Sequence, residues 1–456
     1  MKIKGNLTKG KPFITLLLFA LPMVLSVTLQ QLYNICDSFI AGRYIGDDAL
    51  ASISASYPIT MVYLAIGTGF GIGANIVTAR YIGERNNKKA KETIFTSLIT
   101  IGIIGILLGV ISFIVSEGLI VLIKVDQNAK YFQDTVTYLQ YYSLGILFLF
   151  IYNCVTSLFQ ALGNSRIPLY FLIFSTVLNV ILDYCFVRYL NLGVPGIALA
   201  TFIAQALAAI LSFICLIFYV KKLSLEEIKY FNINRLKSVL MVAIPSILQA
   251  SAVSFGQILI QSLINGYGQD VVAGYGAAYK MCYIIVNIYS TMSNAISTFT
   301  SQNAGAREYK RIMKGYLSGL GLCGILTVVT TIIFVANAEG VVSIMLNEES
   351  SHLVKEVGSQ FIYCVAPFFI LLCIKIPSEG VLKGSKDMRS SVIATSIDLL
   401  VRVVLAYILS NEMGIVGVFI SWPIGWFVGM SVAMIFFYSG RWKKLIGYKV
   451  DTKKIV

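Results

Sequence analysis

Long apolar segments recur along the whole chain, and short polar connections separate them. Windows of about 19 apolar residues, the length of a helix that crosses a bilayer, predict twelve membrane spans. Their approximate limits are 13–41, 51–79, 93–116, 135–161, 167–187, 195–220, 238–265, 271–301, 315–336, 357–382, 390–409 and 415–438. The pattern therefore predicts an all-α integral membrane protein with twelve transmembrane helices.

The charges between the predicted spans alternate in sign from one side of the membrane to the other. The N-terminus, every second connection and the C-terminus together hold 28 Lys and Arg residues, whereas the remaining connections hold five. Basic residues collect on the cytoplasmic side of membrane proteins, so both termini are expected to be cytoplasmic. The net charge of +14 is then explained by loops beside anionic lipid, and no nucleic-acid partner is expected.

Composition excludes several classes of protein. With 57% hydrophobic residues, 13% charged residues and a mean hydropathy of +0.79, the chain is too apolar to be a large soluble protein. The eight cysteines form no CxxC pair and all lie in apolar runs, and His352 is the only histidine. The sequence contains no GxxxxGK[ST] phosphate loop. We therefore expect no enzyme activity, no resident metal or cofactor and no direct use of ATP.

The two halves of the chain resemble each other. "YIGERNNKKAKE" matches "NAGAREYKRIMK" at an offset of 222 residues, "LGVPGIALAT" matches "MGIVGVFISW" at an offset of 221, and Pro22 corresponds to Pro245. A repeat of six spans keeps its direction in the membrane, so the halves form parallel repeats. We predict an N-terminal six-helix lobe over 1–220, a cytoplasmic linker over 221–237 and a C-terminal six-helix lobe with a short basic tail over 238–456.

Charged residues inside membrane spans are costly and are candidates for function. The seven in this sequence are Asp37, Asp183, Lys280, Lys375, Glu379, Asp398 and Arg402. The pairs Lys375/Glu379 and Asp398/Arg402 have opposite signs and a spacing of four residues, which places both members on one helix face. We interpret these two pairs as structural or gating ion pairs.

The two aspartates of the N-terminal half have neutral polar neighbours instead. Gln30, Asn34 and Asp37 recur at helical spacing in the first span, and Asn179 precedes Asp183 by four residues in the fifth. The fourth and sixth spans contribute further polar stripes: Asn153, Ser157 and Gln160, and then Thr201 and Gln205. This pattern predicts a wet, carboxylate-bearing pocket inside the N-terminal lobe. Amide stripes in the C-terminal half are interpreted as hydrogen bonds between helices.

Five segments in order resemble the multidrug and toxic compound extrusion (MATE) transporters. They are "LPMVLSVTLQQLYNICDSFIAGRYIGDDALAS", "ARYIGERN", "ALGNSRIP", "NVILDYCFV" and "GVPGIALAT". The resemblance covers nearly the whole chain and implies twelve helices in two pseudo-symmetric lobes. It also implies secondary active export, by alternating access, of cationic or amphipathic small molecules in exchange for protons or sodium ions.

The resemblance further implies a cation or substrate site in the N-terminal lobe. The matching residues are Asp37, Tyr138, Asn179, Asp183 and Thr201, with Gln30, Asn34 and Gln205 as secondary candidates. A sodium ion would lie at Asp37, Asn179 and Asp183. Burial of Asp183 would favour its neutral form, so it could exchange a proton or cation near neutral pH. The C-terminal lobe departs from other bacterial members, because the seventh span has no acid.

The expected setting is the plasma membrane, where a monomer in the lipid bilayer would take up small-molecule substrates. The alternative function is a related lipid-linked oligosaccharide flippase, although flippases of this kind tend to have fourteen spans and a cation-lined cavity. A membrane enzyme would need paired Asp-rich metal motifs or a catalytic histidine, and the sequence offers neither.

Overall fold

The computed structural model describes residues 6–45, 47–123, 125, 131–190, 192–223, 226–346 and 351–448, without the side chains of 34–39, 41–43, 47–51 and 53. Asp37 and Asn34 are therefore outside the described side chains. The described chain is 88% helical, and it contains twelve helical segments long and apolar enough to span a membrane, which confirms the predicted number.

The helices of the first half are α1 (Pro12–Tyr44), α2 (Asp47–Gly83), α3 (Asn87–Ile114), α4 (Ser116–Leu122), α5 (Phe132–Ala161), α6 (Arg166–Arg188) and α7 (Gly193–Lys221). Those of the second half are α8 (Ile233–Asn265), α9 (Gln269–Gly305), α10 (Tyr309–Ala336), α11 (Ala338–Ser343), α12 (His352–Val365), α13 (Phe369–Gly384), α14 (Met388–Met413), α15 (Ile415–Tyr438) and α16 (Arg441–Leu445). The tenth span is interrupted by a short 3₁₀ helix, Ala366–Phe368. Pro367 lies in this break, since proline has no N–H to continue an α-helix.

The backbone repeats its special conformations in the two halves. Arg85 and Arg307, at corresponding positions, have φ values of 56° and 60°. Gly193 and Gly414 both have a φ of 60°, and each lies at the start of the last span of its half: Gly193 is the first residue of α7, and Gly414 directly precedes α15. Left-handed backbone is rare for residues such as arginine, so its recurrence at matched loops shows that the halves share one design.

The described chain divides into two compact units whose boundaries cut through two helices. Unit 1 comprises Asn6 and Leu21–Ile247, and unit 2 comprises Leu7–Ala20 and the residues from Leu248 onward. Helices α1 and α8 thus each belong to both units, and each changes unit close to its proline, Pro22 or Pro245. The lobe and linker limits predicted from the sequence stay predictions.

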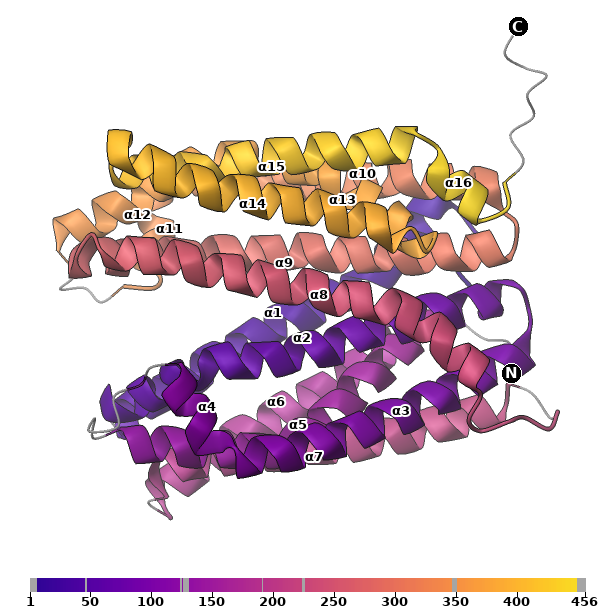
Figure 1. Ribbon diagram of the computed structural model, residues 1–456, viewed down its shortest axis with the longest axis horizontal. Coiled ribbons are helices and arrows are strands. Elements are labelled where there is room, and N and C mark those ends of the chain that lie inside the picture. Colours follow the sequence, from indigo (N-terminus) through magenta and orange to yellow (C-terminus); the bar gives the residue numbers. More distant parts are fainter. Residues whose placement is uncertain are drawn as a thin grey trace, which may run out of the picture. The chain divides into compact units, whose positions relative to one another are not determined.

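In unit 1, α5 packs against α2, α3 and α7, as the purple and magenta helices of Figure 1 show. Glycines permit these close approaches. A Cβ atom on Gly71 of α2 would lie 2.5 Å from Ser157 Oγ, and one on Gly109 of α3 would lie 2.9 Å from the carbonyl oxygen of Ser143. Small residues bring helix backbones together in membranes, where no hydrophobic force drives helices to associate.

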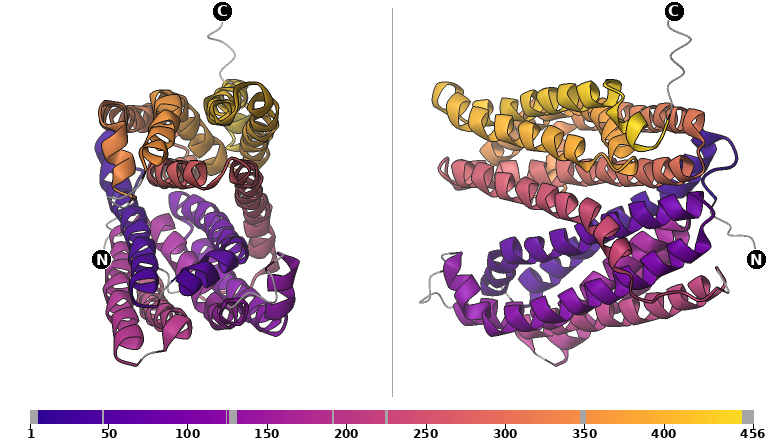
Figure 2. Two further views of the ribbon diagram at one scale, coloured as in Figure 1. Left: turned by 90° about the vertical axis from the view of Figure 1, so that its left-hand side faces the viewer. Right: turned by 45° about the vertical axis from the view of Figure 1, so that its right-hand side comes forward.

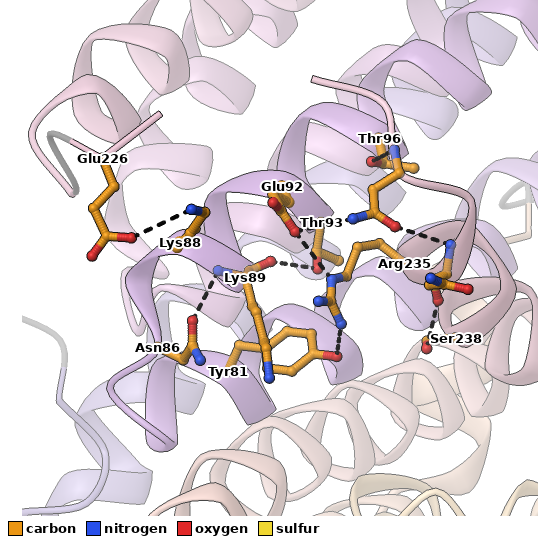
Figure 3. A network of polar contacts seen from close by, with 12 residues as sticks. Tyr81, Asn86, Lys88, Lys89, Glu92, Thr93, Thr96, Glu226, Arg235 and Ser238 are labelled. Atoms are coloured by element: carbon orange, nitrogen blue, oxygen red, sulfur yellow. Dashed lines mark hydrogen bonds and ion pairs between the residues drawn. The ribbon is translucent and has the colours of Figure 1, made fainter. Parts of the chain in front are cut away.

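The first part of α8 is fixed to α2 and α3 by a polar cluster that we call the α8 clasp: Tyr81, Glu92, Thr96, Asn232 and Arg235 (Figure 3). The carboxylate of Glu92 accepts hydrogen bonds from Arg235 Nε at 3.3 Å and from Asn232 Nδ2 at 3.2 Å. Arg235 also donates to the Tyr81 hydroxyl at 2.7 Å. All these residues belong to unit 1, so the clasp explains why the start of α8 is part of that unit.

In unit 2, α9 packs against α12 and α13, and α14 packs against α15. Both views in Figure 2 show the gold and yellow helices α14 and α15 side by side. The start of α1 is held in this unit by Arg311, which donates to the carbonyl oxygens of Leu7, Lys9 and Gly10. Each unit therefore holds the first part of a helix whose remainder belongs to the other unit.

Candidate functional site

Helix α6 carries the predicted carboxylate on its buried face. Asn179 is 1% exposed and Asp183 is completely buried, one helical turn apart. The opposite face of α6 is apolar and exposed, with Phe174, Val177 and Ile181 on it. A helix with an apolar outer face and a polar inner stripe fits a position between lipid and a polar interior.

Thr201 of α7 joins three helices at this site. Its hydroxyl oxygen accepts a hydrogen bond from Asn179 Nδ2 at 3.4 Å and another from the Tyr33 hydroxyl of α1 at 3.2 Å. These two bonds use both lone pairs of the Thr201 oxygen. Thr201 thereby orients the amide of Asn179: it holds the amide nitrogen, and the amide oxygen stays available as an acceptor.

One buried acceptor faces this region without a hydrogen bond. Within the described part of the chain, Asn179 Oδ1 accepts no hydrogen bond, and the carboxylate of Asp183 is on the same helix one turn away. Oxygen atoms of a carboxylate and an amide suit a proton or a hard cation such as sodium. The donor atoms of this region therefore fit the predicted cation site, which stays a prediction.

A small pocket with a volume of about 50 Å³ lies beside Asn179 in unit 1. Its walls come from α1, α5, α6 and α7, and they are formed by Gln30, Tyr33, Leu149, Tyr152, Asn153, Leu172, Ser175, Thr176, Asn179, Ala204, Gln205 and Ala208. The walls combine aromatic rings, amides and apolar side chains, and none of these residues is charged. This mixed lining is typical of small-molecule sites, whereas the volume is well below the roughly 300–1,000 Å³ of a pocket that holds a drug-sized ligand.

The structure brings together part of the predicted set and adds to it. Asn179 and Thr201 are in contact, and Gln30, Gln205 and Asn179 line one pocket. Tyr33 and Tyr152 were not among the predicted site residues. Tyr33 could have been found from its spacing, since it lies three residues after Gln30 on the polar stripe of the first span.

The place of Tyr138 in the site stays a prediction. Its ring stacks on Tyr142 with 6.3 Å between centroids, and Tyr142 stacks on Tyr63 at 6.4 Å. These rings form an aromatic row between α5 and α2. The contribution of Asp37 lies outside the described side chains.

The buried charges of unit 2 form one network. The pairs expected within single helices are both present, with Lys375 Nζ 3.7 Å from Glu379 Oε1 and Arg402 2.6 Å from Asp398 Oδ1. Lys375 also makes a close ion pair with Asp398 of the neighbouring helix α14. Thr395 Oγ1 extends the network to Glu379 at 3.3 Å. The four charges are thus shared between α13 and α14.

The MatE family model matches residues 22–185 and again 245–408. The second match begins and ends 223 residues after the first, so each half of the chain carries a complete copy of the family pattern. The chain belongs to the MatE family. Its members are multidrug and toxic compound extrusion transporters, so the chain is a multi-pass membrane transporter of the MATE multidrug efflux family.

Named relatives agree with this assignment. The chain is 27% identical over 456 residues to "Probable multidrug resistance protein YpnP" of Bacillus subtilis, with 98% of this chain and 99% of that protein covered. It is 23% identical to "Multidrug export protein MepA" of Staphylococcus haemolyticus, with 94% of each chain covered.

Solved structures share the fold. A MOP superfamily transporter from Pyrococcus furiosus, described as having a binding pocket of reverse polarity, superposes with a TM-score of 0.89, 22% identity and coverage of 97% and 98% of the two chains. A MATE protein in complex with MaL6 gives a TM-score of 0.90 at 22% identity, with coverage of 97% and 99%. The twelve-helix, two-lobe architecture of this MATE transporter is therefore that of the family.

Proposed function

We propose that this MATE transporter is a secondary active exporter that exchanges cationic or amphipathic small molecules for inward protons or sodium ions. The single observation that carries the proposal is the position of Asn179. This residue lines the unit 1 pocket, and Asp183 follows it one turn later on the same buried face of α6. Substrate and coupling ion would thus act on one short stretch of one helix.

The side chains that line the pocket suit flat amphipathic cations in their chemistry. Tyr33 and Tyr152 supply ring faces that attract a cation, and Gln30, Asn153 and Gln205 supply adaptable hydrogen-bonding groups. Since no lining residue is charged, no fixed charge pattern selects one substrate. The absence of Lys and Arg from this lining also disfavours a lipid-linked oligosaccharide, whose pyrophosphate would need basic partners.

Coupling follows from the shared helix. A proton or sodium ion that binds at Asp183 removes the negative charge that helps to hold a cationic substrate. By linkage, each of the two ligands then weakens the binding of the other. Entry of the coupling ion from outside would release the substrate there, and release of the ion inside would restore the site.

Ethidium efflux from proteoliposomes tests this proposal, with a proton gradient and a sodium gradient imposed separately. We expect efflux to follow one of the two gradients and to be absent without either. Efflux under neither gradient, from protein shown to be folded, would contradict secondary active export.

We further propose that the protein acts as a monomer in the plasma membrane with both termini in the cytoplasm. The excess of basic residues on one set of connections supports this orientation. A membrane-impermeant maleimide should leave Lys229→Cys unmodified in intact cells and should modify it after lysis. Labelling in intact cells would reverse the orientation.

A further inference from the structure

The buried network of unit 2 is a row of five charged groups that alternate in sign. In order they are Lys383, Glu379, Lys375, Asp398 and Arg402. The row begins and ends with a cation, so two carboxylates serve three basic side chains. Both oxygens of Asp398 are in use, because one accepts from Lys375 and the other from Arg402.

The two ends of the row have different surroundings. Lys383 is the last residue but one of α13, where the carbonyl groups and the negative end of the helix dipole compensate a cation. Arg402 lies in the middle of α14 and is only 9% exposed. The positive charge that the two carboxylates leave uncompensated therefore lies at Arg402.

Arg402 also has a hydrogen-bond donor to spare. One of its terminal nitrogens binds Asp398, and its guanidinium carbon lies 4.5 Å from the ring centroid of Trp422 on α15. Its Nε is buried and has no hydrogen-bond partner among the residues that the structure describes. A buried donor without a partner destabilises a protein, and more so when the donor is charged.

A second donor beside Arg402 is in the same condition. In the described part of unit 2, the indole nitrogen of Trp422 is buried without a hydrogen-bond partner. Arg402 and Trp422 thus offer two buried N–H groups from side chains that contact each other.

We propose that unit 2 binds one small monovalent anion, of the size and charge of chloride, at Arg402 and Trp422. Two unpartnered donors, one of them on an incompletely neutralised guanidinium, form a site that offers hydrogen bonds to an anion. A water molecule could accept the same hydrogen bonds, but it would leave the excess positive charge of the row in place. An anion needs only donors, and it supplies the missing negative charge.

Bromide, which scatters anomalously and resembles chloride, locates the site directly. In crystals of the full chain grown with sodium bromide, we expect an anomalous peak within hydrogen-bond distance of Arg402 Nε and Trp422 Nε1. Ordinary density for water without an anomalous peak at that position would overturn the proposal.

Thermal unfolding of the purified protein measures the affinity. Replacing gluconate by chloride at constant sodium should raise the unfolding midpoint, and the rise should saturate. Trp422→Phe keeps a ring under Arg402 but removes the N–H, so it should weaken chloride binding about tenfold, the loss of one charge-assisted hydrogen bond. The matched control is Trp426→Phe, which alters a second buried indole, whose ring centroid lies 5.9 Å from that of Trp422.

Three results of the titration would overturn the proposal. They are no difference between chloride and gluconate, equal chloride dependence in the wild type and Trp422→Phe, and stabilisation by acetate but not by chloride. The last would indicate a carboxylate site. Because the bromide experiment uses the unaltered chain, the proposal stays testable if Trp422→Phe does not fold.

Discussion

Glu92→Gln removes a single negative charge near the start of α3, and we expect it to lower the stability of the α8 clasp substantially. The side chain of Glu92 is 8% exposed and that of Arg235 is 18% exposed, so the pair is largely shielded from water. The substitution removes the negative charge that accepts from both Arg235 and Asn232. It leaves the guanidinium with the Tyr81 hydroxyl and ring as its remaining partners in the clasp.

The magnitude follows from burial. Breaking a fully buried ion pair from one side costs about 3–5 kcal/mol, whereas an exposed pair contributes about 0–1 kcal/mol. The partial exposure of Arg235 lets water solvate some of the stranded charge. We therefore expect Glu92→Gln to lower the free energy of unfolding by about 2–3 kcal/mol.

The same region supplies a matched control. Glu226 pairs with Lys88 at 3.8 Å, but their side chains are 67% and 47% exposed (Figure 3). Glu226→Gln makes the same chemical change at the surface and should cost less than about 1 kcal/mol. Unfolding in mixed micelles titrated with SDS measures both variants against the wild type.

A double-mutant cycle with Arg235→Gln completes the test. Removing both charges should cost clearly less than the sum of the single substitutions, because neither charge is then left without its partner. Equal losses for Glu92→Gln and Glu226→Gln, or additive losses in the cycle, would refute the argument that burial sets the strength of the clasp.

Three further predictions concern packing, the charge network and the pocket. Gly109→Ala should destabilise unit 1 by about 1–3 kcal/mol, because the new methyl group would lie 2.9 Å from a backbone oxygen. Gly102→Ala on the same helix is the control, since its methyl group would meet nothing within 4 Å, and unfolding titrations compare the two variants. The double variant Lys375→Met/Glu379→Gln should retain substantial cation-driven dye efflux, since the Asp398/Arg402 pair on α14 stays intact. Lys375→Met alone should have a lower efflux rate than the double variant, because it leaves Glu379 without its partner. A well-folded double variant without efflux would place coupling in unit 2. Tyr33→Phe removes the hydroxyl that holds Thr201 and should lower the efflux rate severalfold at unchanged expression, and an unchanged rate would exclude Tyr33 from the site.

The sequence was sufficient to predict much of the fold, because spans and repeats are encoded locally. Apolar length predicts the twelve spans, and matched loops predict the two halves. The division of α1 and α8 between units was not predictable, since it depends on contacts of distant segments such as Arg311 with the residues before α1. Pro367 was noted in the tenth span, but a proline alone does not say whether a helix bends or breaks.

The candidate site was predictable where its residues share one helix. Spacing of four residues put Asn179 beside Asp183. Thr201 was recognised on the polar stripe of the sixth span, and the family resemblance placed it in the site. Contacts between helices were not visible in the sequence. Tyr33 of α1 donates a hydrogen bond to Thr201 of α7. Lys375 pairs with Asp398 on the neighbouring helix α14 as well as with Glu379, four residues away on its own helix. Helical spacing rules describe one helix at a time, so they cannot identify partners of this kind.

The central claim is that Asp183 couples a cation to export, and gradient-driven efflux by Asp183→Asn tests it most directly. The amide keeps the shape of the side chain and removes its change of charge. In proteoliposomes with equal amounts of folded protein, we predict that Asp183→Asn loses gradient-driven ethidium efflux, whereas Asp134→Asn, near the start of α5 and only partly buried, keeps it. Efflux by Asp183→Asn at the wild-type rate, under the gradient that drives the wild type, would contradict the account.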